Sequence, residues 1–413
     1  MARNRVIYQS EALFVTHQYT GNQTIDLVTN GCGGVGGAAP DFAGTHAHIP
    51  AEAMHQIHRV QSANYNFAIN RTDINQFGQL ARIDTAVIDA PTVGLDFTYL
   101  VTNGVNEDAL GISVDSNNDI TPTSSAISGI LSNISGRNYH ILTVKEGSDA
   151  NNSSLQASSD STVISIGNGF ITNYSVNASV GAVPTASVSV EGLNINAQSG
   201  AALMTTPAID PDAGTQGTAT FGLPAPVTGS VGEVIRPGDI QVLFAGASDE
   251  GLQGTGLLTQ LVDDGGRTAA HINSFSIDLP LGRSVLQRLG NSFGFAREID
   301  FPVQVSVSVS ATVADLKAGN LFEELYENTK HDIVLKMHKN IVGGSAAGVN
   351  DAAQLAYVIK NATLDSESFS SSIGDNKSVD LSFTATIGGP QDTTNGLFIS
   401  GTQCGINAIR GSE

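Results

Sequence analysis

The chain carries one pattern of strands twice, and this duplication constrains its fold more than any other feature. Residues 170–195 read FITNYSVNASVGAVPTASVSVEGLNI, and residues 363–388, which lie 193 positions later, read TLDSESFSSSIGDNKSVDLSFTATIG. Each copy has two runs of alternating apolar and polar residues about a short turn that contains glycine, which is typical of a β-hairpin. Repetition of a unit of this size predicts two similar domains in tandem.

A second pair of similar segments, 64–91 and 272–302, precedes the two hairpins in the same order. The matching positions are Phe67-x-Ile69 with Phe275-x-Ile277, and Ile88-Asp89-x-Pro91 with Ile299-Asp300-x-Pro302. The alternating runs that follow predict further strands over 94–101 and 139–144 in the first copy, and over 303–313 and 331–337 in the second. Two pairs of segments in one order favour duplication over chance similarity.

These patterns predict a mainly β protein with two tandem antiparallel β-sandwich or barrel domains, each with a short flanking helix. The expected parts are an N-terminal arm and loop over 1–50, a first β domain over 51–197, a linker over 198–267, and a second β domain over 268–413. The linker is rich in Pro, Gly, Thr and Ala, and its segment GDIQVLF favours one more strand in the second half. Apolar residues at i, i+4 spacing predict the second helix near Leu321 and Tyr326, with a weaker counterpart over 105–112.

A run of glycines near the N-terminus has the spacing of a dinucleotide-binding turn. Gly31, Gly33 and Gly36 form G-x-G-x-x-G, but such a turn needs a helix that begins at its last glycine and holds the pyrophosphate. Pro40 and Pro50 interrupt any helix of the length needed to cross back to a parallel strand. We therefore interpret the run as a loop and expect no cofactor.

Four histidines, His46, His48, His55 and His58, lie within thirteen residues. A helix over 51–60 would place the last two on one face, because residues three apart on a helix are neighbours. No carboxylate or cysteine completes an established zinc spacing, so a structural or interface role is favoured over a metal site. The sequence contains no nucleophile elbow, phosphate-binding loop or paired catalytic carboxylates, and we expect the protein not to be an enzyme.

Charge and apolar content narrow the classes of function further. The formal net charge is −20, and residues 146–235 contain no Lys or Arg, which argues against a protein that grips nucleic acid through its phosphates. The first residues have no apolar segment of the kind found in signal peptides, and no later apolar run approaches 18 residues, so we expect synthesis in a cytoplasm and no membrane partner. The pairing of Cys32 and Cys404 stays open.

The alternation of the hairpins gives each an apolar face and a small, hydrated face that is neutral or acidic. A solvated sheet surface and the wall of a channel for DNA both fit the second face, because a wall without cations does not retain phosphates. Its residues are Asn173, Ser175, Asn177, Ser179, Ser187, Ser189, Glu191, Ser366, Ser368, Ser370, Ser372, Asp380, Ser382 and Thr384.

Three segments, YQSEALFV (8–15), INRTDINQFGQLARIDTAVIDAPTVGLDF (69–97) and NGFITNYSVNASVGAVPTASVSVEGLNI (168–195), resemble the tail tube, or major tail, proteins of long-tailed bacteriophages. The resemblance implies domains of two packed antiparallel sheets with one flanking helix, six of them in each ring, and stacked rings that conduct the genome out of the virion. With two domains per chain, three chains would close a ring with approximate six-fold symmetry. The implied partners are further copies of the chain and other tail proteins, with DNA passing through unbound.

In such a tube, we expect the segment from Arg3 to Pro50 to be ordered by contacts between stacked rings. Two other interpretations stay open on the sequence. A baseplate hub also reuses duplicated tube-like domains, and a β-rich surface adhesin would have a similar composition.

Overall fold

Alternation along the sequence becomes alternation of burial in the strands. Thr92–Leu100 (β8) reads TVGLDFTYL and Gln304–Thr312 (β19) reads QVSVSVSAT, and in both strands every second side chain from the second onward is buried. Their β-branched and aromatic residues suit a pleated surface with one face on a core. The expected mainly β, antiparallel class is confirmed for the described residues, which include two short α-helices.

The computed structural model describes residues 11–17, 25–26, 48–49, 54–88, 91–115, 124–132, 136–146, 149–150, 161–199, 204–205, 220–221, 234–244, 271–287, 289–290, 296–312, 330–338, 353–370, 376–401 and 410–411. The expected helix near Leu321 and Tyr326, the glycine run and both cysteines lie outside them. So do His46 and Ser372.

The chain folds into two halves with corresponding strands. The first half has β1 (Glu11–His17), β4 (Met54–Gln56), β5 (Val60–Ala68), β6 (Arg71–Ile74), β7 (Asp84–Val87), β8, β9 (Arg137–Thr143), β10 (Thr162–Ser179), β11 (Thr185–Gly192) and β12 (Asn194–Ser199). The second has β15 (Ile240–Phe244), β16 (His271–Pro280), β17 (Arg283–Leu286), β18 (Ala296–Ile299), β19, β20 (Lys330–His338), β21 (Ala353–Ser370), β22 (Ser378–Thr386) and β23 (Gly396–Gly401).

The remaining elements are short. The helices are α1 (Val105–Leu110) and α2 (Ser128–Ser132), and a 3-10 turn covers Pro237–Asp239. The short strands are β2 (Ile25–Asp26), β3 (His48–Ile49), β13 (Met204–Thr205), β14 (Thr220–Phe221) and β24 (Arg410–Gly411).

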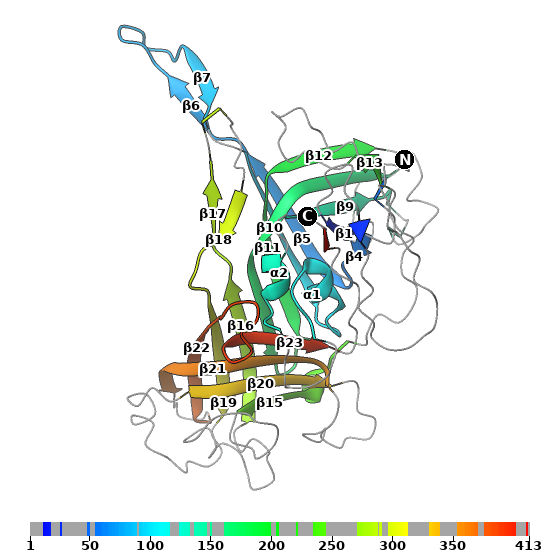
Figure 1. Cartoon of the computed structure of the whole chain (residues 1–413), viewed down its shortest axis with the longest axis vertical. Helices are drawn as coiled ribbons and strands as arrows, with labels where there is room; N and C mark the ends of the chain where they lie inside the picture. The colour runs from blue at the N-terminus through cyan, green and yellow to red at the C-terminus, as the bar shows by residue number, and fades with distance from the viewer. Residues whose placement is uncertain are drawn as a thin grey trace.

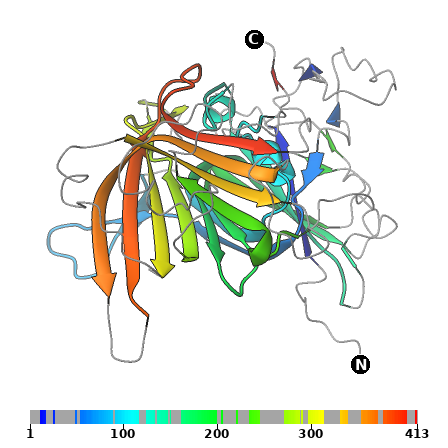
Figure 2. The ribbon, with the colours of Figure 1, turned by 90° about the horizontal axis from the view of Figure 1, so that it is seen from below.

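One long sheet joins the two halves. Its eight central strands follow the order β5-β8-β11-β10-β16-β19-β22-β21, so that the four strands of the first half are continued by the four of the second. Figure 2 shows strands of this sheet side by side in the view from below. A second layer covers each half, with β4, β1, β9 and β12 on the first and β15, β20 and β23 on the second. The apolar side chains between the layers form one core cluster that extends through both halves.

The two halves correspond residue by residue, including their irregularities. The pairing of β5 with β8 matches that of β16 with β19 at an offset of 212, and both contain a bulge at the same point. The hairpin of β10 and β11 matches that of β21 and β22 at an offset of 193, again with a shared bulge. This correspondence corrects the sequence match of Phe67 with Phe275. Phe67 lies opposite Val93, and the offset of 212 makes its counterpart Leu279, the residue after Asp278 in β16.

Long strands β10 and β21 belong to both layers, and each bends at an asparagine with left-handed backbone. Figure 1 shows β10 as an arched ribbon. Asn168 has φ 56° and Asn361 has φ 57°, and they are 193 residues apart. The backbone N–H of Asn168 donates to Oδ1 of Asn138, and that of Asn361 donates to Oδ1 of Asp332, both over 2.9 Å. Asparagine tolerates this conformation better than most residues, which explains its presence at both bends.

Three strands of the second layer, β1, β4 and β15, bear on local expectations from the sequence. Glu11–His17 belongs to the core layer rather than to an arm, since β1 pairs with β9 and Phe14 is fully buried. The segment around His55 is the strand β4, not a helix, because it pairs with β1 and continues the second layer. The extra strand in the linker is confirmed as β15, which pairs with β20.

We predict that Asn168→Gly retains the stability of the protein and that Asn168→Ala loses about 1 kcal/mol. Alanine keeps a Cβ but lacks the short polar side chain that makes the left-handed region tolerable for asparagine, whereas glycine has no Cβ to clash. The free energy of unfolding in urea, followed by circular dichroism, measures the difference. Equal stability of the two variants would contradict a backbone role for this asparagine.

Candidate functional site

The polar residues of the joined sheet form one uninterrupted face. Strand pairing aligns one residue from each of the eight strands in a row of hydroxyl, amide and carboxylate groups. In order, this row is Ser62, Thr98, Ser187, Ser175, Asp278, Ser306, Thr384 and Thr363. Side chains directly opposite in adjacent strands share a face, so this row crosses the whole sheet. We call the surface that contains it the polar face.

The sequence-predicted channel residues that the structure describes all lie on the polar face. Asn177 and Ser179 are exposed, and Ser187 and Ser189 are half-buried between their neighbours. The opposite face of the same strands, with Tyr174, Val176, Val188 and Val190, is buried. The structure therefore brings residues from both hairpins onto one continuous surface, whereas the sequence showed only that each hairpin has a polar side.

The polar face carries carboxylates, and the strands that form it place no basic side chain on it. Its acidic residues are Asp96, Glu191, Asp278 and Asp380. The eight central strands contain no Arg, and their one Lys, Lys360, lies before the bend at Asn361, in the part of β21 that belongs to the second layer. The Nδ2 of Asn173 donates to Oδ1 of Asp278 across the junction of the two halves, over 3.1 Å. At neutral pH, this surface repels polyanions.

The junction of the halves is an antiparallel pairing of β10 with β16. Seven successive residue pairs connect them, from Asn173 with Pro280 to Ser179 with Ser274. Hydrogen bonds extend the junction at both ends, where Leu281 N–H donates to the carbonyl of Thr172 and Val180 N–H donates to the carbonyl of Asn273, each over 2.8 Å. The pairing satisfies backbone groups that would otherwise stay open along two strand edges.

Basic side chains reinforce the same junction from the second half. Arg283 lies over the ring of Phe170 at 4.8 Å, and its Nε donates to the carbonyl of Ile171 over 3.4 Å. Arg297 forms a 2.9 Å ion pair with Glu191. A guanidinium over an aromatic ring adds roughly 0.5 to 2 kcal/mol to such a contact.

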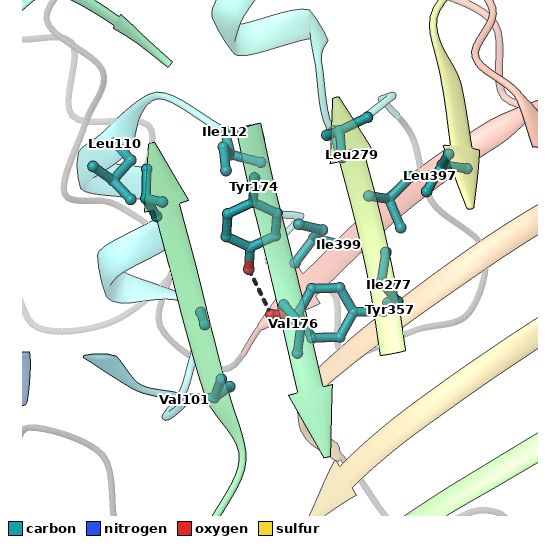
Figure 3. Close-up of a cluster of buried hydrophobic side chains, with 14 of the residues drawn as sticks. Val101, Leu110, Ile112, Tyr174, Val176, Ile277, Leu279, Tyr357, Leu397 and Ile399 are labelled. Atoms are coloured by element: carbon teal, nitrogen blue, oxygen red, sulfur yellow. Dashed lines mark hydrogen bonds between the residues drawn. The ribbon is translucent and has the colours of Figure 1, made fainter. Parts of the chain in front are cut away.

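A buried carboxyl group joins both halves beneath the junction. Oε1 of Glu107, on α1, accepts hydrogen bonds from the hydroxyls of Tyr99 at 2.8 Å and Tyr174 at 3.1 Å. The hydroxyl of Tyr174 also bonds to that of Tyr357, from the second half, over 2.8 Å. Figure 3 shows Tyr174 and Tyr357 directed toward each other among Val176, Ile277 and Ile399. Burial raises the pKa of the Glu107 carboxyl, and the tyrosine hydrogen bonds partly oppose that rise.

The two outer edges of the joined sheet expose side chains whose counterparts at the junction are buried. Tyr65 and Phe67 on β5 are 44% and 46% exposed, while their counterparts Ile277 and Leu279 on β16 are fully buried. On the opposite edge, Phe369 of β21 is 42% exposed and corresponds to the fully buried Val176. Each outer edge therefore resembles one side of the junction without its partner strand.

Two hairpins extend from the end of the sheet. β6 with β7 and β17 with β18 correspond to each other at the same offset of 212, and Figure 1 shows the first projecting far beyond the body. Phe77, Leu80 and Leu289, near the turns, are fully exposed. Exposed apolar residues at a projecting end are typical of contact surfaces.

The histidines expected to be structural contact the folded layers. Burial lowers the pKa of His55 to about 4, with Arg137 and His58 contributing to the decrease. The backbone N–H and carbonyl of His58 bond to the side chain of Asn106, each over 2.9 Å. In the part of the chain that the structure describes, no group of three potential metal ligands occurs and no helix is long and apolar enough to span a membrane.

No protein-family model matches the chain, and no curated protein matches it. The functional interpretation therefore depends on the geometry of the polar face, the junction and the open edges.

The cluster at Glu107 was not foreseen from the sequence. The only local signal was a glutamate within the apolar segment VNEDALGI, and nothing in that segment indicates its tyrosine partners.

We predict that Glu107→Gln removes a pH dependence of stability. The folded-state pKa of the Glu107 carboxyl is raised above the ordinary value of 4.5. Its contribution to the free energy of unfolding is therefore complete below about pH 4.5 and is lost as the pH rises through the folded-state pKa. A difference of one between the folded and unfolded pKa values changes the free energy of unfolding by about 1.4 kcal/mol. Urea unfolding at several pH values between 4 and 8 measures this, with Glu298→Gln, at an exposed carboxylate, as control. Parallel curves for Glu107→Gln and the unmodified protein would show that Glu107 is not responsible.

Proposed function

We propose that the protein is a structural subunit of a bacteriophage tail tube, in which copies join edge to edge into rings and the rings stack around a channel for DNA. The observation that carries this proposal is that both strands of the internal junction have a counterpart at an outer edge of the sheet, where no partner strand is paired with it within the described residues. Within the chain, the first half joins the second through β10 and β16. The strands that correspond to β16 and β10 at the ends of the sheet are β5 and β21. Among the described residues, β5 pairs only with β8, and the 364–370 part of β21 pairs only with β22, so each has one open side.

Open strand edges of this length favour pairing with another chain. Natural proteins usually protect such edges with charges, proline or a covering segment, because unpaired N–H and C=O groups recruit other strands. The described part of β5 contains no Lys, Asp, Glu or Pro. Two half-exposed aromatic rings on the same strand, Tyr65 and Phe67, add an apolar gain of about 1 kcal/mol or more each when they are covered.

Pairing of β21 with β5 of a neighbour repeats the internal junction, so each chain adds two similar units to a ring. A heterologous contact that rotates by a fixed angle gives a closed ring when the rotations complete a full turn, and an open filament when they do not. The resemblance to tail tubes implies six units per ring, and three chains supply them. Around the ring, contacts between the two halves of one chain then alternate with contacts between neighbouring chains.

The polar face is assigned to the channel in this proposal. Its Ser, Thr and Asn side chains and its carboxylates offer no site where phosphates accumulate, so that DNA passes without being retained. The basic side chains Arg283 and Arg297 are engaged with Phe170 and Glu191 at the junction.

We predict that purified protein assembles into rings of three chains and that Phe67→Ser prevents assembly. Phe67 is half-exposed in the single chain, so its replacement should lower the free energy of unfolding by about 1 kcal/mol. The matched control is Leu279→Ser at the corresponding buried position, which should lose about 2 to 5 kcal/mol. Light scattering gives the mass and averaged electron micrographs give the symmetry. Six full chains in a ring, or unchanged assembly of Phe67→Ser, would oppose the proposal.

We also predict that replacing Asn177, Ser179, Ser187 and Ser189 with Lys leaves assembly nearly intact and slows the passage of DNA, with stronger dependence on salt. Exposed polar substitutions change stability little, whereas each phosphate contact adds affinity that falls with salt. Assembled tubes can be treated with an amine reagent that is too large to enter the channel. Labelling of the new lysines from outside would show that the polar face is not the channel wall.

A further inference from the structure

We propose that the β21 edge of one copy pairs with the β5 edge of the next in one defined register, with Ser368 opposite Asn66 and Glu367 opposite Phe67. This inference rests on the proposed ring. It specifies a contact for which the internal junction provides the template.

The register follows from two measured correspondences. At the junction, Ser175 lies opposite Asp278. The β10–β11 hairpin corresponds to the β21–β22 hairpin at an offset of 193, which converts Ser175 into Ser368. The pairing of β16 with β19 corresponds to that of β5 with β8 at an offset of 212, which converts Asp278 into Asn66. The shared bulges leave no freedom to shift either correspondence.

A groove beside β5 supports the same placement. Two cavities of about 410 Å³ occupy corresponding positions in the halves, one lined by β15 and β16 and the other by β1 and β5. Corresponding lining residues include Val242 with Leu13 and Ile272 with Val60. In the second half, Ala178, Ser179 and Val180 from the β10–β11 hairpin of the first half form the remaining wall.

Among the described residues, no hairpin lies in the corresponding place of the first-half groove, where Glu11, Asp149 and Ala150 form part of the wall. In the proposed register, Ser370 at the end of β21 of the neighbouring copy lies opposite Asn64, next to Ala63 in the wall of the groove. The paired strand of a second copy therefore ends beside this groove.

An arginine supports the register from the other end of the strand. Arg71 corresponds to Arg283, whose guanidinium donates to the carbonyl of Ile171. The counterpart of Ile171 in β21 is Leu364. Arg71 is exposed in the single chain, and the proposed pairing places the carbonyl of Leu364 in the neighbour where this guanidinium can reach it.

Disulfide cross-linking tests the register directly. In a background with Cys32→Ser and Cys404→Ser, chains that carry both Ser368→Cys and Asn66→Cys are assembled and oxidised. Residues opposite one another in antiparallel strands have Cα atoms about 4.5 to 5.5 Å apart, within the range for a disulfide. We expect covalent dimers and trimers on non-reducing gels and no larger species, because three chains close the ring.

Two matched variants calibrate the result. Ser175→Cys with Asp278→Cys reproduces the template pair and should form a disulfide within one chain. Ser368→Cys with Asn70→Cys tests the register that the matched Phe67 and Phe275 motifs would give. Its second cysteine lies four residues away, or about 13 Å along a strand, and it should not cross-link.

The outcomes separate the register from the ring. Three-chain rings by light scattering with cross-linking of the Asn70 pair, and not of the Asn66 pair, overturn the register while the ring stands. A mass of one chain at every concentration overturns both. Efficient cross-linking of the Asn66 pair, with the Asn70 pair unlinked, supports the register.

Discussion

Pairing between β10 and β16 is the interaction on which the rest of the structure depends. A four-stranded sheet leaves backbone donors and acceptors open at both of its edges, and each half of this chain satisfies one edge of the other. The pairing also closes the apolar layer beneath, so that Ile277 and Leu279 are buried and one core extends through both halves. The halves consequently share one sheet and one core.

The junction has features that the outer edges cannot reproduce. Phe170, Tyr174, Glu191 and Arg297 correspond in order to Thr363, Glu367, Thr384 and Thr85. The ring–guanidinium contact and the ion pair are therefore specific to the internal junction, while the backbone register is common to both. In the proposed ring, the contact between chains depends more on strand pairing and apolar cover, and less on charge.

Much of the fold could be predicted from the sequence because it depends on local periodicity. The strands β8 and β19 and both hairpins follow from alternation, and the duplicated order follows from comparing the copies. The matched phenylalanines, Phe67 and Phe275, were misleading because residue type can recur at shifted positions, whereas backbone pairing and bulges define the correspondence. The strand at His55 depends on pairing with β1, and the Glu107 cluster brings together residues far apart in sequence. Neither is encoded in a local pattern.

Covalent linkage of the two halves has a kinetic consequence for assembly. A partner strand on the same chain is present at an effective concentration that can reach about the millimolar range, irrespective of how much protein the cell contains. In the proposed six-unit ring, folding thus completes every second junction before any encounter between molecules. Closure then takes three molecules instead of six, which lowers the molecularity of nucleation and makes the first ring far less sensitive to dilution.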